Sequence, residues 1–318
     1  MKKLLLFWLL CGIAAVFVYS QAQKIINEPI RVEGEKIILI KSGASPNKIA
    51  EILVENNLIK EKWHFILYSK INKIYPKIKA GEYSVKDDIS LAQLANLLTS
   101  GKTYLRKITF AEGLTSREIA DILADDEYMK GDFGEIAEGT FLPETYTYSR
   151  EENRRHIVKQ ATEAMAKVLQ KAWDERDAGL PLNSKEEMLV LASIVEKETG
   201  IATERPMVAS VFINRLRKGM LLQTDPTVIY ALTMGKTDLK RNLTFKDLET
   251  DSPYNTYKYE GLPPAPICNP GKAAIMAVAH PDKTPYLYFV ASGNGGHNFA
   301  RTLEEHNRNV KHWRAVNK

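Results

Sequence analysis

The segment that most constrains the fold of this chain is residues 184–199, with the sequence SKEEMLVLASIVEKET. Ser184 and Glu187 form a capping box, which predicts the N-terminus of a helix. Behind this cap, apolar side chains cover nearly the whole helical surface, which indicates a helix buried inside a large domain. The apolar positions are Met188, Leu191, Ala192, Ile194 and Val195.

Glu198 continues this apolar surface. At about 100° per residue it falls between Ile194 and Val195 on the helical wheel, whereas Glu196 falls on the other side, near Leu189. A carboxyl group on an apolar face must be paired or protonated, because desolvation raises its pKa. A glutamic acid kept protonated near neutral pH is what a general acid needs in order to protonate a glycosidic oxygen. A solvated, salt-bridged helix end is the alternative interpretation.

The N-terminus carries an apolar run, residues 4–19, that follows Lys2 and Lys3. This run predicts a transmembrane anchor at residues 1–22, with the lysines inside and the rest of the chain exported. A cleavable signal peptide is the alternative. We expect a single-pass protein of the inner (cytoplasmic) membrane with a periplasmic or extracytoplasmic domain, joined to its anchor by a polar linker at residues 23–35.

The 318 residues are enough for two domains. Three segments share one pattern, a β-rich run, a cap and an amphipathic helix, which predicts an α+β fold. We expect a small βα module at residues 36–105, which contains the first two segments. A larger α+β domain at residues 106–318 would contain the third. Ser45 is expected to cap the first of these helices, with Pro46 at the first helical position. Ser90 should cap the second, which stops at Gly101, and Thr115 should cap the third in a box with Glu118.

Composition argues against several functional classes. The net charge is only +5, and no basic–aromatic platform is present, so we expect no nucleic-acid partner. The two cysteines, Cys11 in the apolar run and Cys268, allow no internal disulfide in the exported part and no cysteine metal cluster. The histidines lack metal-ligand spacing, so we expect no metal and no cofactor. His297, in the glycine loop, is the histidine expected nearest a substrate.

Four long motifs follow one another in the second half of the chain. They are SIVEKET from Ser193, ERPMVASVFINRLRKGMLLQTDPTVIY from Glu204, SPYNTYKYEGLPPAPICNPG from Ser252 and AHPDKTPYLYFVASGNGGHNF from Ala279. With these motifs the chain resembles the endolytic murein transglycosylase family, the YceG-like proteins, from about residue 107 to 310. Residues 36–105 resemble a LysM-type polysaccharide-binding module; generic α+β construction is the alternative.

The resemblance implies a membrane-anchored lyase that cuts nascent peptidoglycan strands internally, without water. The cut would leave a 1,6-anhydro-N-acetylmuramic end and terminate glycan elongation near the peptidoglycan synthases. The family's catalytic residue is the second glutamate of E-K-E-T, which is Glu198 in this chain. Glu196 is the competing acid within the motif.

Further residues are expected to bind the glycan. Pro226 is expected to break regular structure, which would place Gln223, Thr224 and Asp225 on a loop. These side chains would bond to glycan hydroxyls or orient Glu198; a self-satisfied turn is the alternative. The other candidates are Asn214 as a cleft residue, and Tyr254, Asn255 and Tyr257 for sugar stacking and N-acetyl binding, with core packing as the alternative.

Two other functions remain open at the level of sequence. One is a non-catalytic, membrane-anchored peptidoglycan-binding scaffold in which Glu198 is structural. The other is a lysozyme-type hydrolase that uses Glu198 with a second carboxylate, Asp225 or Glu144. Glu144 lies in the segment FLPETY, where members of the resembled family commonly carry aspartate.

Overall fold

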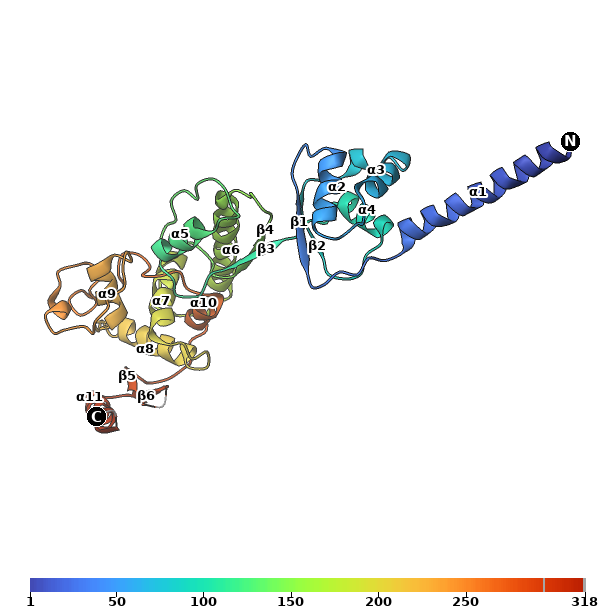
Figure 1. Cartoon of the computed structure of the whole chain (residues 1–318). Coiled ribbons are helices and arrows are strands. Elements are labelled where there is room, and N and C mark those ends of the chain that lie inside the picture. The colour runs from blue at the N-terminus through green and yellow to red at the C-terminus, as the bar shows by residue number, and fades with distance from the viewer. Residues whose placement is uncertain (294, 317–318) are drawn as a thin grey trace. The chain divides into compact units, whose positions relative to one another are not determined.

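The computed structural model describes residues 1–293 and 295–316. Its first element is the helix α1 (Lys2–Asn27), drawn in blue in Figure 1, which is long and apolar enough to cross a membrane. Its large apolar side chains within residues 4–19 are exposed. A single-pass anchor and a signal sequence are both compatible with such a helix. The helix extends into the segment predicted as a linker. Beyond it, Ile30 pairs with Ile89 and the amide of Val32 donates to Asp88 at 3.0 Å.

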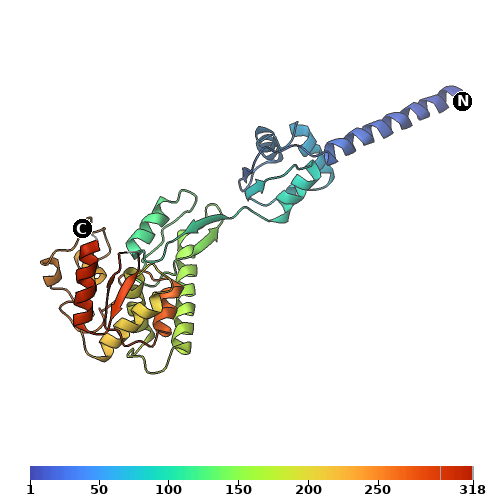
Figure 2. The same ribbon diagram turned by 90° about the horizontal axis from the view of Figure 1, so that it is seen from below.

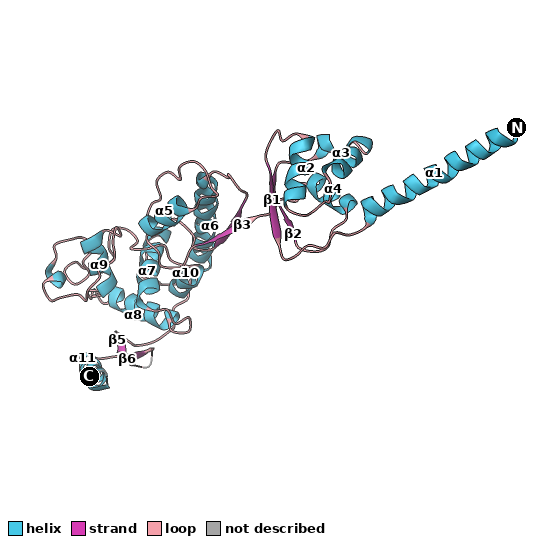
Figure 3. Ribbon diagram, in the orientation of Figure 1, coloured by secondary structure: helices cyan, strands magenta, loops and turns pink. Residues whose placement is uncertain are grey.

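The chain divides into two compact units, one formed by residues 1–106 with 147–151 and the other by residues 107–146 with 152–318. Beyond α1, the first unit contains β1 (Lys36–Ile40), α2 (Pro46–Glu55), α3 (Lys62–Ile71), the 3₁₀ turn η1 (Tyr75–Lys77), β2 (Gly81–Val85) and α4 (Leu91–Ser100). Strands β1 and β2 are antiparallel, with Lys36 opposite Val85. Figure 3 shows the two strands of this unit in magenta beside its helices, and the strands share one apolar core with these helices.

The predicted caps are confirmed. Ser45 accepts a hydrogen bond from the amide of Lys48 at 3.2 Å and caps α2. Ser90 closes a full capping box, and Gly101 ends α4 in the left-handed region with φ 75°. The LysM-type resemblance of this unit stays a prediction.

The second unit contains α5 (Ser116–Asp125), α6 (Arg154–Glu175), α7 (Lys185–Glu198), α8 (Arg205–Arg217), α9 (Asp225–Thr233), η2 (Asp247–Glu249), α10 (Lys272–Ala279), β5 (Tyr288–Ala291), β6 (His297–Ala300) and α11 (Leu303–Val316). Strand β4 (Thr145–Tyr148) has residues in both units. Strand β3 (Arg106–Thr109) joins the two units in sequence and pairs with β4. Strands β5 and β6 form an antiparallel hairpin with α11 beside it (Figure 2). The α+β class is confirmed.

Helix α7 is the centre of this unit. Its eight residues from 188 to 195 are all buried, and it packs against α6, α8 and α10. Ser184 caps the helix as predicted, accepting from the amide of Glu187 at 3.2 Å. The carboxylate of Glu187 bonds instead to the amide of Asn183, at 2.7 Å, so the predicted reciprocal bond forms one residue earlier.

Candidate active site

Glu198 is the last residue of α7, and its half-buried side chain lines a cavity of about 560 Å³. The other walls come from α8, from the segment that leads into α9, from Tyr257, from β5 and from α11. Residues distant in sequence therefore meet around one carboxyl group at the end of a buried helix.

The environment of Glu198 favours its protonated form. The pKa of Glu198 is raised to about 7, chiefly by desolvation and also by the negative charge of Asp225. A hydrogen bond from Thr224 and the positive charges of His297 and Arg215 oppose it. Because Glu198 ends its helix, the negative end of the helix dipole also disfavours a carboxylate there. A substantial fraction of Glu198 is therefore a neutral acid at neutral pH.

Thr224 orients this acid. Its hydroxyl donates to Oε1 of Glu198, so the proton of the neutral carboxyl group belongs on Oε2. Thr224 is itself held in place: its amide donates to Oγ1 of Thr256 at 3.1 Å, and its carbonyl accepts from Oγ1 of Thr227 at 2.7 Å. Thr224 precedes α9 but makes no side-chain cap, because its hydroxyl donates its hydrogen bond to Glu198 instead.

The segment around Thr224 differs from its prediction. Pro226 does not break regular structure but lies in the first turn of α9, which begins at Asp225. Proline is tolerated there because the first amides of a helix have no partner within the helix. Only Gln223 and Thr224 of the expected loop precede the helix, and Gln223 adopts a left-handed φ of 49°. That turn brings the side chain of Thr224 to Glu198.

Three of the predicted binding residues line the cavity with Glu198: Gln223, Asp225 and Tyr257. The hydroxyl of Tyr257 donates to Oδ1 of Asp225 at 2.6 Å, which ties the second polar loop to the start of α9. Arg215 lines the same cavity and donates to the carbonyls of Leu222, at 2.9 Å, and Leu287, at 2.7 Å.

The other four predicted binding residues do not line this cavity; of these, Thr224 bonds to Glu198, and Asn214, Tyr254 and Asn255 do not. Asn214 donates its amide to the carbonyls of Thr284 and Tyr286, at 2.8 and 3.0 Å. Asn255 is 0% exposed, and its amide binds carbonyls of its own loop. Tyr254 packs on Tyr230, with 4.9 Å between ring centroids. For these residues, packing and loop closure outweigh the expected contact with a sugar.

Glu196, the competing acid, points elsewhere. Its side chain is only 5% exposed and pairs with Arg205 at 3.2 Å, and its Oε2 accepts from the amide of Gly271 at 2.8 Å. Burial raises the pKa of Glu196 as well, while the amide of Gly271 and the charge of Arg205 lower it. This pairing fixes α7 against the start of α8.

Tyr288 and His306 also line the cavity, although neither was among the predicted site residues. The available signal was the helical spacing of Leu303, His306 and Val310, which places the histidine within the apolar stripe of α11. His297 does not line the cavity; its Nδ1 lies 2.7 Å from Oε2 of Glu204. No cluster of three metal-ligating side chains occurs within residues 1–293 and 295–316.

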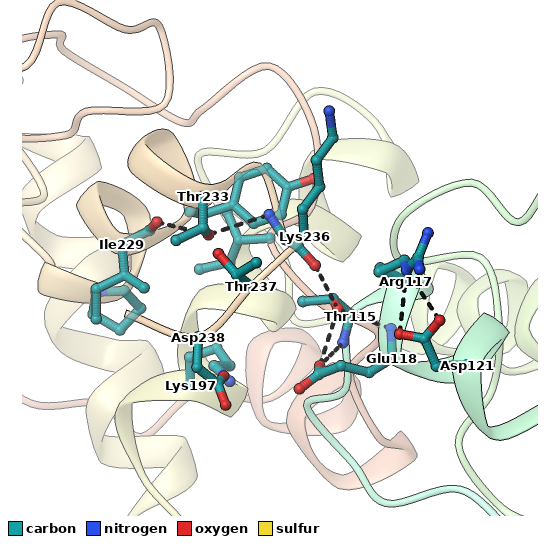
Figure 4. A pocket seen from close by; sticks show the side chains of 14 residues that line it. Thr115, Arg117, Glu118, Asp121, Lys197, Ile229, Thr233, Lys236, Thr237 and Asp238 are labelled. Carbon is teal, nitrogen blue, oxygen red and sulfur yellow. Dashed lines mark hydrogen bonds and ion pairs between the residues drawn. The ribbon is translucent and has the colours of Figure 1, made fainter. Parts of the chain in front are cut away.

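A second cavity, of about 260 Å³, lies between the start of α5 and α9 (Figure 4). Its wall includes Lys197 and Pro226, the sequence neighbours of Glu198 and Asp225, and also Tyr230. Charged side chains at its rim are partly paired with each other, as Arg117 is with Asp121. None of the predicted site residues lines this second cavity.

Comparison with known proteins identifies the family. The chain matches the YceG-like family over residues 38–312. It is 35% identical, over 93% of its length, to an endolytic murein transglycosylase of Bacillus subtilis, and the match covers 89% of that protein. It is 29% identical to an endolytic murein transglycosylase of Streptococcus pneumoniae over 89% of this chain, but spans only 59% of that relative. The crystal structure of a YceG-like protein from Listeria monocytogenes matches with a TM-score of 0.53 and 33% identity, covering 87% of this chain and 99% of that one. The chain belongs to the YceG-like family.

Proposed function

We propose that this protein is an endolytic peptidoglycan lytic transglycosylase that cleaves the β-1,4 bond between N-acetylmuramic acid and N-acetylglucosamine within glycan strands. The observation that carries the proposal is the position of Glu198, which lines a cavity and accepts a hydrogen bond from Thr224, with its pKa raised to about 7 by burial. The curated relatives are named endolytic murein transglycosylases, which supports the same activity.

The proposed reaction needs one carboxyl group in two successive roles. Glu198 first donates the proton on Oε2 to the leaving O4, and the bond from C1 to O4 breaks. The carboxylate that results takes the proton of the C6 hydroxyl of the same sugar, and O6 then bonds to C1. The 1,6-anhydro ring closes and Glu198 regains its proton. Because the nucleophile belongs to the substrate, proximity replaces the activation of water.

The surroundings of Glu198 supply orientation and charge balance. Thr224 holds Oε1, which leaves the protonated oxygen free for the glycosidic oxygen. Gln223, Asp225 and Tyr257 are proposed to bind the glycan because they line the same cavity. We further propose that α1 anchors the protein in the cytoplasmic membrane, that the first unit binds glycan as LysM-type modules do, and that cleavage terminates elongation close to peptidoglycan synthases.

A lysozyme-type hydrolase is the competing activity, because Asp225 gives the cavity a second carboxylate. Glu144, the other candidate, is exposed and does not line that cavity. Mass spectrometry of peptidoglycan digested by the full-length protein in detergent separates the two activities. We expect anhydro ends, one water lighter than hydrolytic products. Reducing ends would establish the hydrolase instead, and no products would leave only a binding protein.

The pH dependence of the reaction is expected to follow Glu198. Since the acid must be protonated, kcat/KM should fall as the pH rises through about 7.

Two substitutions are expected to move this descending limb in opposite directions. Asp225→Asn removes a negative charge that raises the pKa of Glu198, so the limb should move to lower pH. Thr224→Val removes a hydrogen bond that lowers the same pKa, so the limb should move to higher pH. The pH of the descending limb is measured for each variant from the full profile of kcat/KM against pH. Shifts of the same sign in both variants would contradict the assignment of the limb to Glu198.

A further inference from the structure

His306 lies on α11 and lines the cavity that contains Glu198. Its ring stacks on Tyr288, with 5.3 Å between the ring centroids and 26° between the planes. The guanidinium carbon of Arg215 lies 5.1 Å from the centroid of the same tyrosine ring. The imidazole is therefore positioned by an aromatic neighbour, which is in turn placed beside a fixed arginine.

The two ring nitrogens of His306 have different environments. Nδ1 is buried and has no hydrogen-bond partner within residues 1–293 and 295–316. Nε2 is not a buried atom without a partner. A proton on Nδ1 would leave a buried donor unpaired, which is rarer and more costly than an unpaired acceptor. We therefore assign the neutral tautomer with its proton on Nε2. Burial and the charge of Arg215 both lower the pKa of His306, which also favours the neutral ring.

His306 thus adds a neutral N–H donor to a cavity wall that also has apolar side chains, among them Phe212, Leu222 and Val290. A sugar hydroxyl would use the donor but not the apolar wall. A 2-acetamido group would use both, because its carbonyl oxygen accepts a hydrogen bond and its methyl group favours an apolar surface. This combination of chemistry distinguishes an N-acetylated sugar from one with a free amine.

We propose that Nε2 of His306 donates to the carbonyl oxygen of a 2-acetamido group on the sugar bound beside Glu198, and that this contact makes the site selective for N-acetylated glycan. The proposal rests on the proposed function, whose site it extends. His306 acts here as a specificity-determining residue. The proton chemistry remains with Glu198.

The informative substitution is His306→Phe, which keeps a ring to stack on Tyr288 and removes the donor. The full-length variant is compared with the unsubstituted protein on uncrosslinked peptidoglycan strands, before and after enzymatic de-N-acetylation. We expect the unsubstituted protein to lose roughly three- to tenfold in kcat/KM on de-N-acetylated strands, the range of one neutral hydrogen bond. His306→Phe should already show that loss on acetylated strands and lose little more on the others.

His306→Gln is the matched control, because the amide nitrogen of glutamine can take the place of Nε2. It should retain most of the preference for acetylated strands. Equal activity of His306→Phe and the unsubstituted protein on acetylated strands would overturn the proposal. So would an equal loss on both substrates, or a glutamine variant that discriminates no better than phenylalanine.

A binding measurement separates this proposal from the proposed function. Affinity for acetylated and de-N-acetylated strands is measured on Glu198→Gln and on the double variant Glu198→Gln with His306→Phe, which require no turnover. A preference for acetylated strands that disappears in the double variant supports the role of His306, whatever product the active enzyme forms. The same preference in both proteins overturns it.

Discussion

Glu198→Gln is expected to lower kcat/KM by roughly three orders of magnitude, within the range of about 10²–10⁴ that general acid–base catalysis contributes. Glutamine keeps the size of the side chain, and its carbonyl oxygen can still accept the hydrogen bond from Thr224. It has no acidic proton to donate to O4 and cannot take one from the C6 hydroxyl. Both halves of the proposed reaction are therefore lost in a protein that folds.

The measurement is the rate of anhydro-end formation at pH 6, about one unit below the pKa of Glu198, where most of the acid is protonated. Thermal unfolding of the variant checks that the fold is intact. Glu196→Gln is the matched control from the same motif, since Glu196 bonds to Arg205 and Gly271 rather than lining the cavity. The Glu196→Gln variant should still form anhydro ends, because Glu198 is unchanged, even if the substitution lowers the stability of the fold. Activity of Glu198→Gln near that of the unsubstituted protein would refute the role of the acid.

Arg205→Met is expected to destabilise the second unit by about 3 kcal/mol, the lower end of the cost of breaking a buried pair. The arginine is 10% exposed and Glu196 only 5%, so the substitution leaves a buried carboxylate with the amide of Gly271 as its remaining partner. Because burial raises the pKa of Glu196, the loss should shrink at acidic pH as this carboxyl group takes up a proton.

Urea unfolding of the full-length protein in detergent, followed by intrinsic fluorescence at several pH values, measures this effect. Glu112→Gln is the comparison, because Glu112 contacts the same arginine at 3.3 Å but is 41% exposed. An exposed pair contributes about 0–1 kcal/mol, so this variant should be nearly as stable as the unsubstituted protein. If Arg205→Met and Glu112→Gln lost equal amounts of unfolding free energy, burial of Glu196 would not be the cause of the destabilisation.

The parts of the fold that local sequence determines were predicted well. Caps at Ser45, Ser90 and Thr115 follow from bonds within one helical turn, and all three form. The apolar surface of α7 is buried, and Glu198 continues that surface at the end of the helix, as the helical wheel predicts. Such features depend on helical geometry alone, which the sequence carries directly.

The parts that depend on tertiary contacts were not predicted. Pro226 reads as a helix breaker unless it is known to fall in a first turn, where its missing amide costs nothing. Asn255 looks like a polar loop residue, yet it is fully buried because its amide closes the loop on Leu248 and Thr250. Tyr288 and His306 reach the cavity only when the hairpin packs against α8 and α11 packs against the hairpin, which no local pattern specifies.

The most direct test of this account is the titration of the Glu198 carboxyl group itself. Carboxyl carbon NMR of the protein labelled at glutamate, with Glu198→Gln to assign the resonance, gives its pKa. The account predicts a value near 7, well above the 4.5 of a free side chain, because the protein desolvates the group. A value at or below that of a free glutamate would contradict it, since Glu198 would then be ionised at neutral pH and have no proton to give.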